Sequence, residues 1–206
     1  MCYCSIYMRV QTLIIFGRSG SGKGTQADLL LKFITSRDPE KRVLYIETGQ
    51  KFREFAQRDN YTAQLTREKM GKGGLLPEFM PIWVWANSFV ENFTGKEHLV
   101  LDGLSRQQHE APILDSALKF YNREHSTIIV INVSSGWAIK RLLERKRNDD
   151  NVDDIKRRVE WFDTSVVPTL DYFRNNDRYK MVHIDGEQSI ERVHQDIVSA
   201  IDWQND

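Results

Sequence analysis

The chain has 206 residues, of which 40% are hydrophobic and 28% charged, the balance of a soluble globular protein with one sizeable core. Its 29 basic and 29 acidic residues cancel, so no overall field favours nucleic acid or a membrane, and any anion site must be a local arrangement of charge. Apolar runs fall far short of the roughly 20 residues that span a bilayer, and Cys2 and Cys4 indicate neither disulfides nor a zinc site, so we expect a cytoplasmic protein.

Five short runs rich in Val, Ile and Leu predict strands, and amphipathic stretches between them predict helices. The strands are expected at 10–16, 43–47, 98–102, 127–133 and 180–185. The helices are expected at 23–36, 49–58, 62–72, 78–93, 108–122, 135–146, 152–174 and 189–202. Because the strands lack strict alternation and are separated by helices, they favour an open parallel sheet covered on both faces. The ligand crevice of such a sheet lies beyond the carboxyl ends of its strands.

The stretch FGRSGSGKGT (16–25) follows the first predicted strand and opens the first predicted helix. Its glycines are Gly17, Gly20, Gly22 and Gly24. Glycine permits a loop whose amides point inward as an anion nest, and the helix N-terminus adds positive potential. Lys23 can then reach the β and γ phosphates of a nucleotide. The usual phosphate-loop pattern G-x-x-x-x-G-K-S/T fails by one residue, because Gly24 follows the lysine and the hydroxyl comes at Thr25. A plain flexible turn is the alternative.

GRSGSGKGTQ resembles the adenylate kinase form of this loop, G-x-P-G-S-G-K-G-T-Q, in which Gly-Thr follows the lysine. The resemblance implies that Mg²⁺ accompanies ATP and that these residues bind the nucleotide: Gly20, Ser21, Gly22, Lys23, Gly24 and Thr25. The chain departs from the family at Ser19, where proline would stiffen the loop.

The acceptor side of that family is matched by three further segments, ETGQKFRE (47–54), MGKGGLLPEFM (70–80) and VLDGLSRQQHE (100–110). The resemblance implies that the nucleoside monophosphate is bound by Thr48, Gly49, Arg53, Leu76, Gly103, Arg106 and Glu110. Arg53 would hold the acceptor's phosphate and Arg106 would bridge the transferring phosphate. Asp102 would hold magnesium through its waters, with Thr25 as the second metal-side residue. Leu104 and Ser105 replace the family's Phe-Pro.

Glu110 stands where the family has a glutamine that reads adenine. A glutamine amide offers a donor and an acceptor, whereas a carboxylate only accepts. A carboxylate can take the N6 hydrogen of adenine but faces the N1 lone pair, while guanine offers two donors. AMP remains the favoured acceptor, with a solvated acid at a helix start as the alternative role of Glu110.

The stretch 137–162 concentrates basic charge and resembles the family's lid. Its arginines are Arg141, Arg145, Arg147 and Arg158. The resemblance implies that Arg141 stacks on the ATP base, that the other three face the phosphates, and that Asp149 and Asp150 anchor the lid. Planar guanidinium groups suit a transferring phosphoryl group. Only Lys146 separates Arg145 from Arg147, so the lid is minimal. The alternative is an exposed, ion-paired helix face. We expect Trp161 to pack against the sheet.

We therefore predict one α/β domain over 1–206, a three-layer P-loop NTPase fold with a five-stranded parallel sheet. Its core comprises 9–47, 95–144 and 160–206, its helical monophosphate-binding insert about 48–94, and its lid about 145–157.

The predicted function is a monomeric short-lid nucleoside monophosphate kinase that turns ATP and AMP into two ADP. Its catalytic residues would be Lys23, Arg106, Arg145, Arg147 and Arg158. The alternatives are a related kinase that prefers GMP, CMP or UMP, and a weakly active or non-catalytic nucleotide-binding homologue. An ATPase acting on nucleic acid is disfavoured by the neutral net charge.

Overall fold

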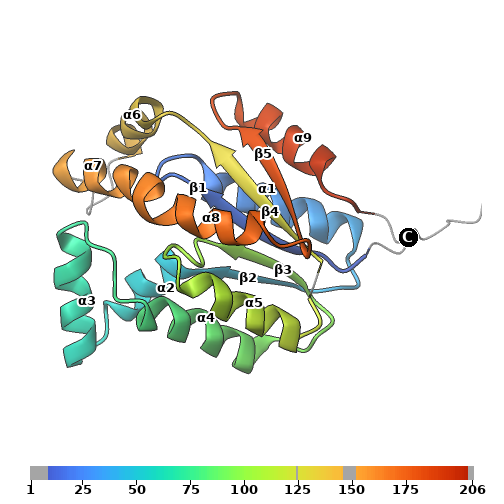
Figure 1. Ribbon diagram of the computed structural model, residues 1–206, viewed down its shortest axis with the longest axis horizontal. Coiled ribbons are helices and arrows are strands. Elements are labelled where there is room, and N and C mark those ends of the chain that lie inside the picture. Colours follow the sequence, from blue (N-terminus) through green and yellow to red (C-terminus); the bar gives the residue numbers. More distant parts are fainter. Residues whose placement is uncertain (1–8, 124, 146–151, 204–206) are drawn as a thin grey trace, which may run out of the picture.

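A five-stranded parallel sheet forms the centre of the molecule (Figure 1). The computed structural model describes residues 9–123, 125–145 and 152–203. The strands are β1 (Thr12–Gly17), β2 (Val43–Glu47), β3 (His98–Asp102), β4 (Ser126–Asn132) and β5 (Tyr179–Asp185). They lie in the order β2-β3-β1-β4-β5, and every neighbouring pair is parallel. The predicted α/β fold is confirmed, and β1 occupies the middle of the sheet.

Helices cover both faces of the sheet because successive strand residues point to opposite sides. The covering helices are α1 (Lys23–Arg37), α4 (Phe79–Asn92), α5 (Glu110–Phe120), α8 (Val167–Arg174) and α9 (Ile190–Ala200). Leu13 and Ile15 of β1 belong to the core cluster shared with α1 and α9. Ile14 and Phe16 belong to the cluster on the other face, shared with α4, α5 and α8. The ends of β1 and β3 are therefore held rigidly from both sides.

The segment between β2 and β3 is helical, as the sequence predicted. It contains α2 (Thr48–Phe55) and α3 (Tyr61–Gly71) and ends with α4. Its helices enclose a small apolar cluster of their own, formed by Phe52, Phe55, Ala63, Met80 and Val84. Because this cluster is separate from the two clusters on the sheet, the insert has its own packing unit beside the ends of β2 and β3 (Figure 1).

The segment after β4 holds α6 (Ser135–Arg145), α7 (Val152–Trp161) and a π-helical turn, η1 (Phe162–Val166), which leads into α8. The helical run predicted over 152–174 has the predicted bounds, but it contains a π-helical turn that the sequence did not predict. Pro168 near the start of α8 lacks the N–H that would continue the α-helical ladder, so the regular pattern is interrupted before it. No helix in the described part of the chain combines the length and apolarity that crossing a bilayer requires.

Candidate active site

A cavity of about 590 Å³ lies at the carboxyl ends of β1, β2 and β3. Its walls bring together most of the predicted site residues: Gly20, Gly22, Lys23, Gly24, Thr25, Thr48, Gly49, Arg53, Leu76, Asp102, Gly103, Arg106, Glu110, Arg141, Arg145 and Arg158. Ser21 does not line the cavity, because its side chain is buried against Gly17. Arg147, Asp149 and Asp150 lie outside the described residues.

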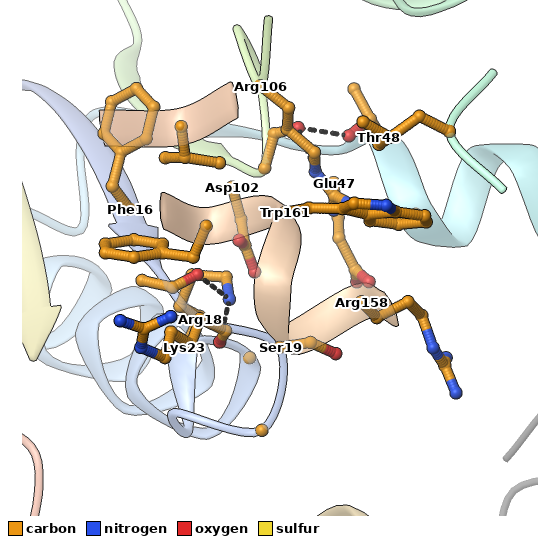
Figure 2. Close-up of a pocket in the computed structure, with 18 of the residues that line it drawn as sticks. Phe16, Arg18, Ser19, Lys23, Glu47, Thr48, Asp102, Arg106, Arg158 and Trp161 are labelled. Carbon is orange, nitrogen blue, oxygen red and sulfur yellow. Dashed lines mark hydrogen bonds between the residues drawn. The ribbon is translucent and has the colours of Figure 1, made fainter. Parts of the chain in front are cut away.

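Lys23 is held inside the loop that precedes α1 by the loop's own backbone. Its Nζ donates hydrogen bonds to the carbonyl oxygens of Gly17, at 2.8 Å, and Arg18, at 2.9 Å (Figure 2). Burial lowers the pKa of Lys23 to about 8, against the opposing attraction of Asp102. Gly22, with φ 92°, is the N-cap of α1 and supplies no side-chain cap, so the first N–H groups of the helix are left for a ligand. The arrangement is a positively charged cradle.

The same loop contains a reverse turn from Arg18 to Ser21. The N–H of Ser21 donates to the carbonyl of Arg18 at 3.0 Å, and Gly20, the third residue of the turn, has φ 86°. This is the pattern of a type II turn, whose second position accommodates proline. Ser19 occupies that second position, so the backbone tolerates the proline that the sequence lacks.

Asp102 ends β3 inside the cavity and is 5% exposed. Burial raises its pKa, while Lys23 and Arg106 oppose the rise. A buried carboxylate with the hydroxyl of Thr25 on the same cavity is a hard oxygen donor set, which fits Mg²⁺. Within the described residues no cluster of three or more His, Cys, Asp or Glu side chains could hold a metal alone. A magnesium ion there would therefore rely on water and nucleotide oxygens as well.

The loop after Asp102 is tied together through the carbonyl of Gly103. That oxygen accepts hydrogen bonds from the Thr48 hydroxyl, at 2.7 Å, and from Nε of Arg106, at 3.1 Å. Gly103 has φ 73°, and a Cβ there would lie 2.6 Å from Nη2 of Arg106. Glycine is favoured there because the positive φ strains any other residue, and a Cβ would also displace the Arg106 guanidinium.

Ser105 adopts a left-handed backbone, with φ 52°, and is fully buried. Proline is fixed near a φ of about −65° and could not take this conformation. The proline that the family carries at this position is therefore excluded here by the backbone itself. Leu104, which replaces the family's aromatic residue, packs into the main core and does not line the cavity.

Arg18 and Glu47 are among the cavity residues that the sequence did not single out. Glu47 ends β2 and accepts a hydrogen bond from Arg53 at 3.0 Å, so the predicted phosphate-binding arginine is paired with a carboxylate. Its position at a strand's carboxyl end was the signal that could have found it. Trp161 was expected to pack on the sheet, but it is half-buried and lines the cavity from α7 (Figure 2).

Glu110 is 1% exposed at the start of α5, so the alternative of a solvated acid is wrong. Its Oε1 accepts a hydrogen bond from Gln107 at 3.4 Å, and Gln107 also donates to the carbonyl of Leu76. Its Oε2 is buried without a hydrogen-bond partner among the described residues. Burial raises the pKa of Glu110 to about 7, partly offset by Arg106. A buried, half-satisfied carboxyl in a cavity requires a ligand or a proton.

Three of the described arginines of α6 and α7 line the cavity: Arg141, Arg145 and Arg158. Arg145 ends α6, and Nε of Arg158 donates to the carbonyl of Asp154 at 3.4 Å. The guanidinium of Arg141 lies over the ring of Trp137, 4.7 Å from its centroid, so it is already stacked on a side chain of its own helix. Figure 2 shows Arg158 and Trp161 on the side of the cavity away from the loop that carries Lys23.

Comparison with known proteins agrees with this geometry. The family model described as adenylate kinase matches residues 15–178. An adenylate kinase of Azobacteroides pseudotrichonymphae is 32% identical over 195 residues, covering 91% of this chain and 95% of the relative. An adenylate kinase of Corynebacterium urealyticum is 29% identical, covering 92% and 98%, and adenylate kinase 1 of Nostoc sp. is 26% identical, covering 92% and 97%. The chain therefore belongs to the adenylate kinase family.

Proposed function

We propose that the protein is a nucleoside monophosphate kinase that transfers the γ-phosphate of ATP·Mg to AMP and yields two ADP. The observation that carries this proposal is one cavity whose walls include Lys23 and Asp102 together with Arg53, Arg106 and Arg158. Family membership supports a phosphotransferase. We further propose that it works as a monomer.

In this mechanism the ATP phosphates occupy the cradle at the start of α1, where backbone N–H groups and Lys23 meet their charge. A phosphate oxygen of AMP attacks the γ-phosphorus as the bond to the β–γ bridging oxygen breaks, so no covalent enzyme intermediate forms. Arg106 and Arg158 stabilise the charge on the transferring group. Magnesium, held on the side of Asp102 and Thr25, would neutralise phosphate charge. Positioning and electrostatics supply the catalysis.

The unpartnered Oε2 of Glu110 favours a second candidate acceptor, GMP. An ionised Glu110 offers two acceptors, which suit the N1–H and 2-amino groups of guanine. A protonated Glu110 offers one donor and one acceptor, as glutamine does, and suits adenine. Because its pKa is about 7, both forms exist near neutrality.

A coupled assay with AMP, GMP, CMP and UMP tests activity and base choice together. The assay compares the parent with Glu110→Gln at about pH 6 and about pH 8, on either side of that pKa. We expect AMP to be the best acceptor and Glu110→Gln to lower the relative rate with GMP. If the substitution left the rate with GMP relative to AMP unchanged at both pH values, Glu110 would not read the base. If no monophosphate produced diphosphate while calorimetry still showed ATP binding, the chain would be a non-catalytic homologue.

A further inference from the structure

Arg18, the second residue of the phosphate loop, makes four side-chain hydrogen bonds that leave the loop. Two form a bidentate ion pair with Asp163 of η1, at 2.7 and 2.6 Å. A third runs from Nη1 to the carbonyl of Val159 in α7, at 3.1 Å, and a fourth from Nε to the carbonyl of Val133 after β4, at 3.2 Å. The guanidinium also lies 4.8 Å from the centroid of the Phe162 ring. One side chain thus joins the loop to the end of α7.

These contacts engage the guanidinium of Arg18 with groups of the protein itself. Its fork is matched by a carboxylate, a geometry that planar bidentate pairing favours, and only 14% of the side chain is exposed. Although Arg18 lines the cavity, its charge-bearing end is engaged by Asp163 on the α7 side. The arrangement is that of a structural tie rather than of an arginine reserved for a phosphate.

The tie links two cations of the proposed mechanism. The carbonyl of Arg18 accepts the hydrogen bond from Nζ of Lys23 at 2.9 Å, so moving Arg18 moves the group that holds Lys23. Its guanidinium holds the carbonyl of Val159, the residue after Arg158, at 3.1 Å. Arg18 therefore contacts both Lys23 and the backbone next to Arg158.

The loop needs such a tie because its own backbone is loosely restrained. Gly17, Gly20 and Gly22 all have positive φ, and Ser19 leaves the second position of the turn without proline. We propose that Arg18, locked by Asp163, is a positioning residue that fixes Lys23 relative to Arg158 during phosphoryl transfer. This proposal rests on the proposed kinase function.

A set of variants of the full chain tests the proposal. Arg18→Met keeps an unbranched apolar stem beside Phe162 but removes the fork, and Asp163→Asn removes only the partner's charge. Each is also combined with Arg158→Ala. Asp171→Asn is the matched control, because Asp171 in α8 is exposed, pairs with Arg174 one turn away and does not line the cavity. Calorimetric stoichiometry with ATP gives the folded, binding-competent fraction, so that rates refer to competent protein.

We expect Arg18→Met and Asp163→Asn each to lower kcat about tenfold, since a small misplacement of a catalytic group has a large kinetic cost. The KM for AMP should stay within about twofold, because the acceptor side is not tied by Arg18. In the Arg158→Ala background either substitution should lose most of its effect, which is the signature of residues acting through one another. Asp171→Asn should behave like the parent.

An unchanged or higher kcat in Asp163→Asn would overturn the proposal, because it would show that the pair restrains nothing or that Arg18 is better used elsewhere. Full additivity with Arg158→Ala would also overturn it. If the parent made no diphosphate, the proposed function would fail on its own. The same variants would then be compared by their ATP affinity. A loss of about threefold that disappears with Arg158→Ala would support the positioning role, and an additive loss would refute it.

Discussion

The two loops that flank the candidate reaction centre share a serine-for-proline replacement but differ in backbone conformation at that serine. The donor loop, 17–22, and the acceptor loop, 103–106, follow the neighbouring strands β1 and β3, and each carries a serine where the family has proline. Ser19 lies in a turn position that proline can occupy, whereas Ser105 has φ 52°, which proline cannot adopt. In the donor loop the replacement removes a restraint that the turn could have accepted. In the acceptor loop it goes with a backbone conformation that proline cannot adopt.

The loops also differ in what holds them. In the acceptor loop the carbonyl of Gly103 accepts one hydrogen bond from within the loop, from Arg106, and one from Thr48, 55 positions away in the chain. The donor loop is restrained by a bidentate ion pair between Arg18 and Asp163, which are 145 positions apart. The family resemblance pointed to Thr48 and Arg106, but nothing in it pointed to Asp163.

The largest expected effect is on the donor side. Lys23→Ala should lower kcat by roughly 10²–10³-fold, because it removes a preorganised cation from the transferring phosphate. Arg106→Ala is the acceptor-side counterpart and should be of similar size. Steady-state kinetics with AMP and a thermal melt for each variant separate lost chemistry from lost folding. Near-normal turnover in a folded variant would remove that residue from the mechanism.

Proline substitution at the acceptor loop is the most direct test of the difference in backbone conformation between the two loops. Ser105→Pro should lower the free energy of unfolding by on the order of 3 kcal/mol, because the native φ is forbidden to proline. Ser105→Gly is the control and should be neutral or stabilising, since glycine takes a positive φ freely and no buried hydroxyl is left unpartnered. Urea unfolding measures both. A stable Ser105→Pro protein would mean that the two loops share one backbone.

Glu110, four residues after Arg106, makes the acceptor side sensitive to pH. Its folded-state pKa is raised to about 7 from 4.5, so between these values the native state keeps a proton that the unfolded chain has released. The stability contributed by this residue is therefore lost as pH rises, and the loss is complete above about pH 7. Relative to the parent, Glu110→Gln should gain roughly 1–3 kcal/mol across this window. Parallel stability curves for the two proteins would contradict this assignment.

The smallest effect is expected at the donor loop. Ser19→Pro should raise the free energy of unfolding by about 0.5–1 kcal/mol, because proline restricts the unfolded chain and fits the turn. Thermal unfolding alongside the parent measures the gain. Destabilisation by Ser19→Pro would show that the donor turn, like the acceptor loop, excludes proline.

The sequence was sufficient to predict the succession of strands and helices along the chain and the edge of the sheet that carries the site. Lys23, Asp102 and Arg106 could be placed there because glycine spacing and strand ends are local signals. The Arg18–Asp163 pair could not be predicted, because the sequence around either residue does not indicate which distant residue it pairs with. The left-handed Ser105 and the burial of Glu110 were also hidden, because serine and glutamate are ordinary in exposed loops and helix starts. The π-helical turn was masked by a continuous helical pattern over 152–174.

That π-helical turn determines where this segment can change length. A π-helical turn holds one residue more than an α-helical turn. Deleting one residue from 162–166 could therefore close the wide turn into an α-helical one and leave α7 facing nearly as it does now relative to α8. A deletion inside α7 has no such turn to absorb it and would rotate the residues before it by about 100°. The wide turn is therefore the place where this helical segment can lose a residue while Arg158 and Trp161 keep their direction.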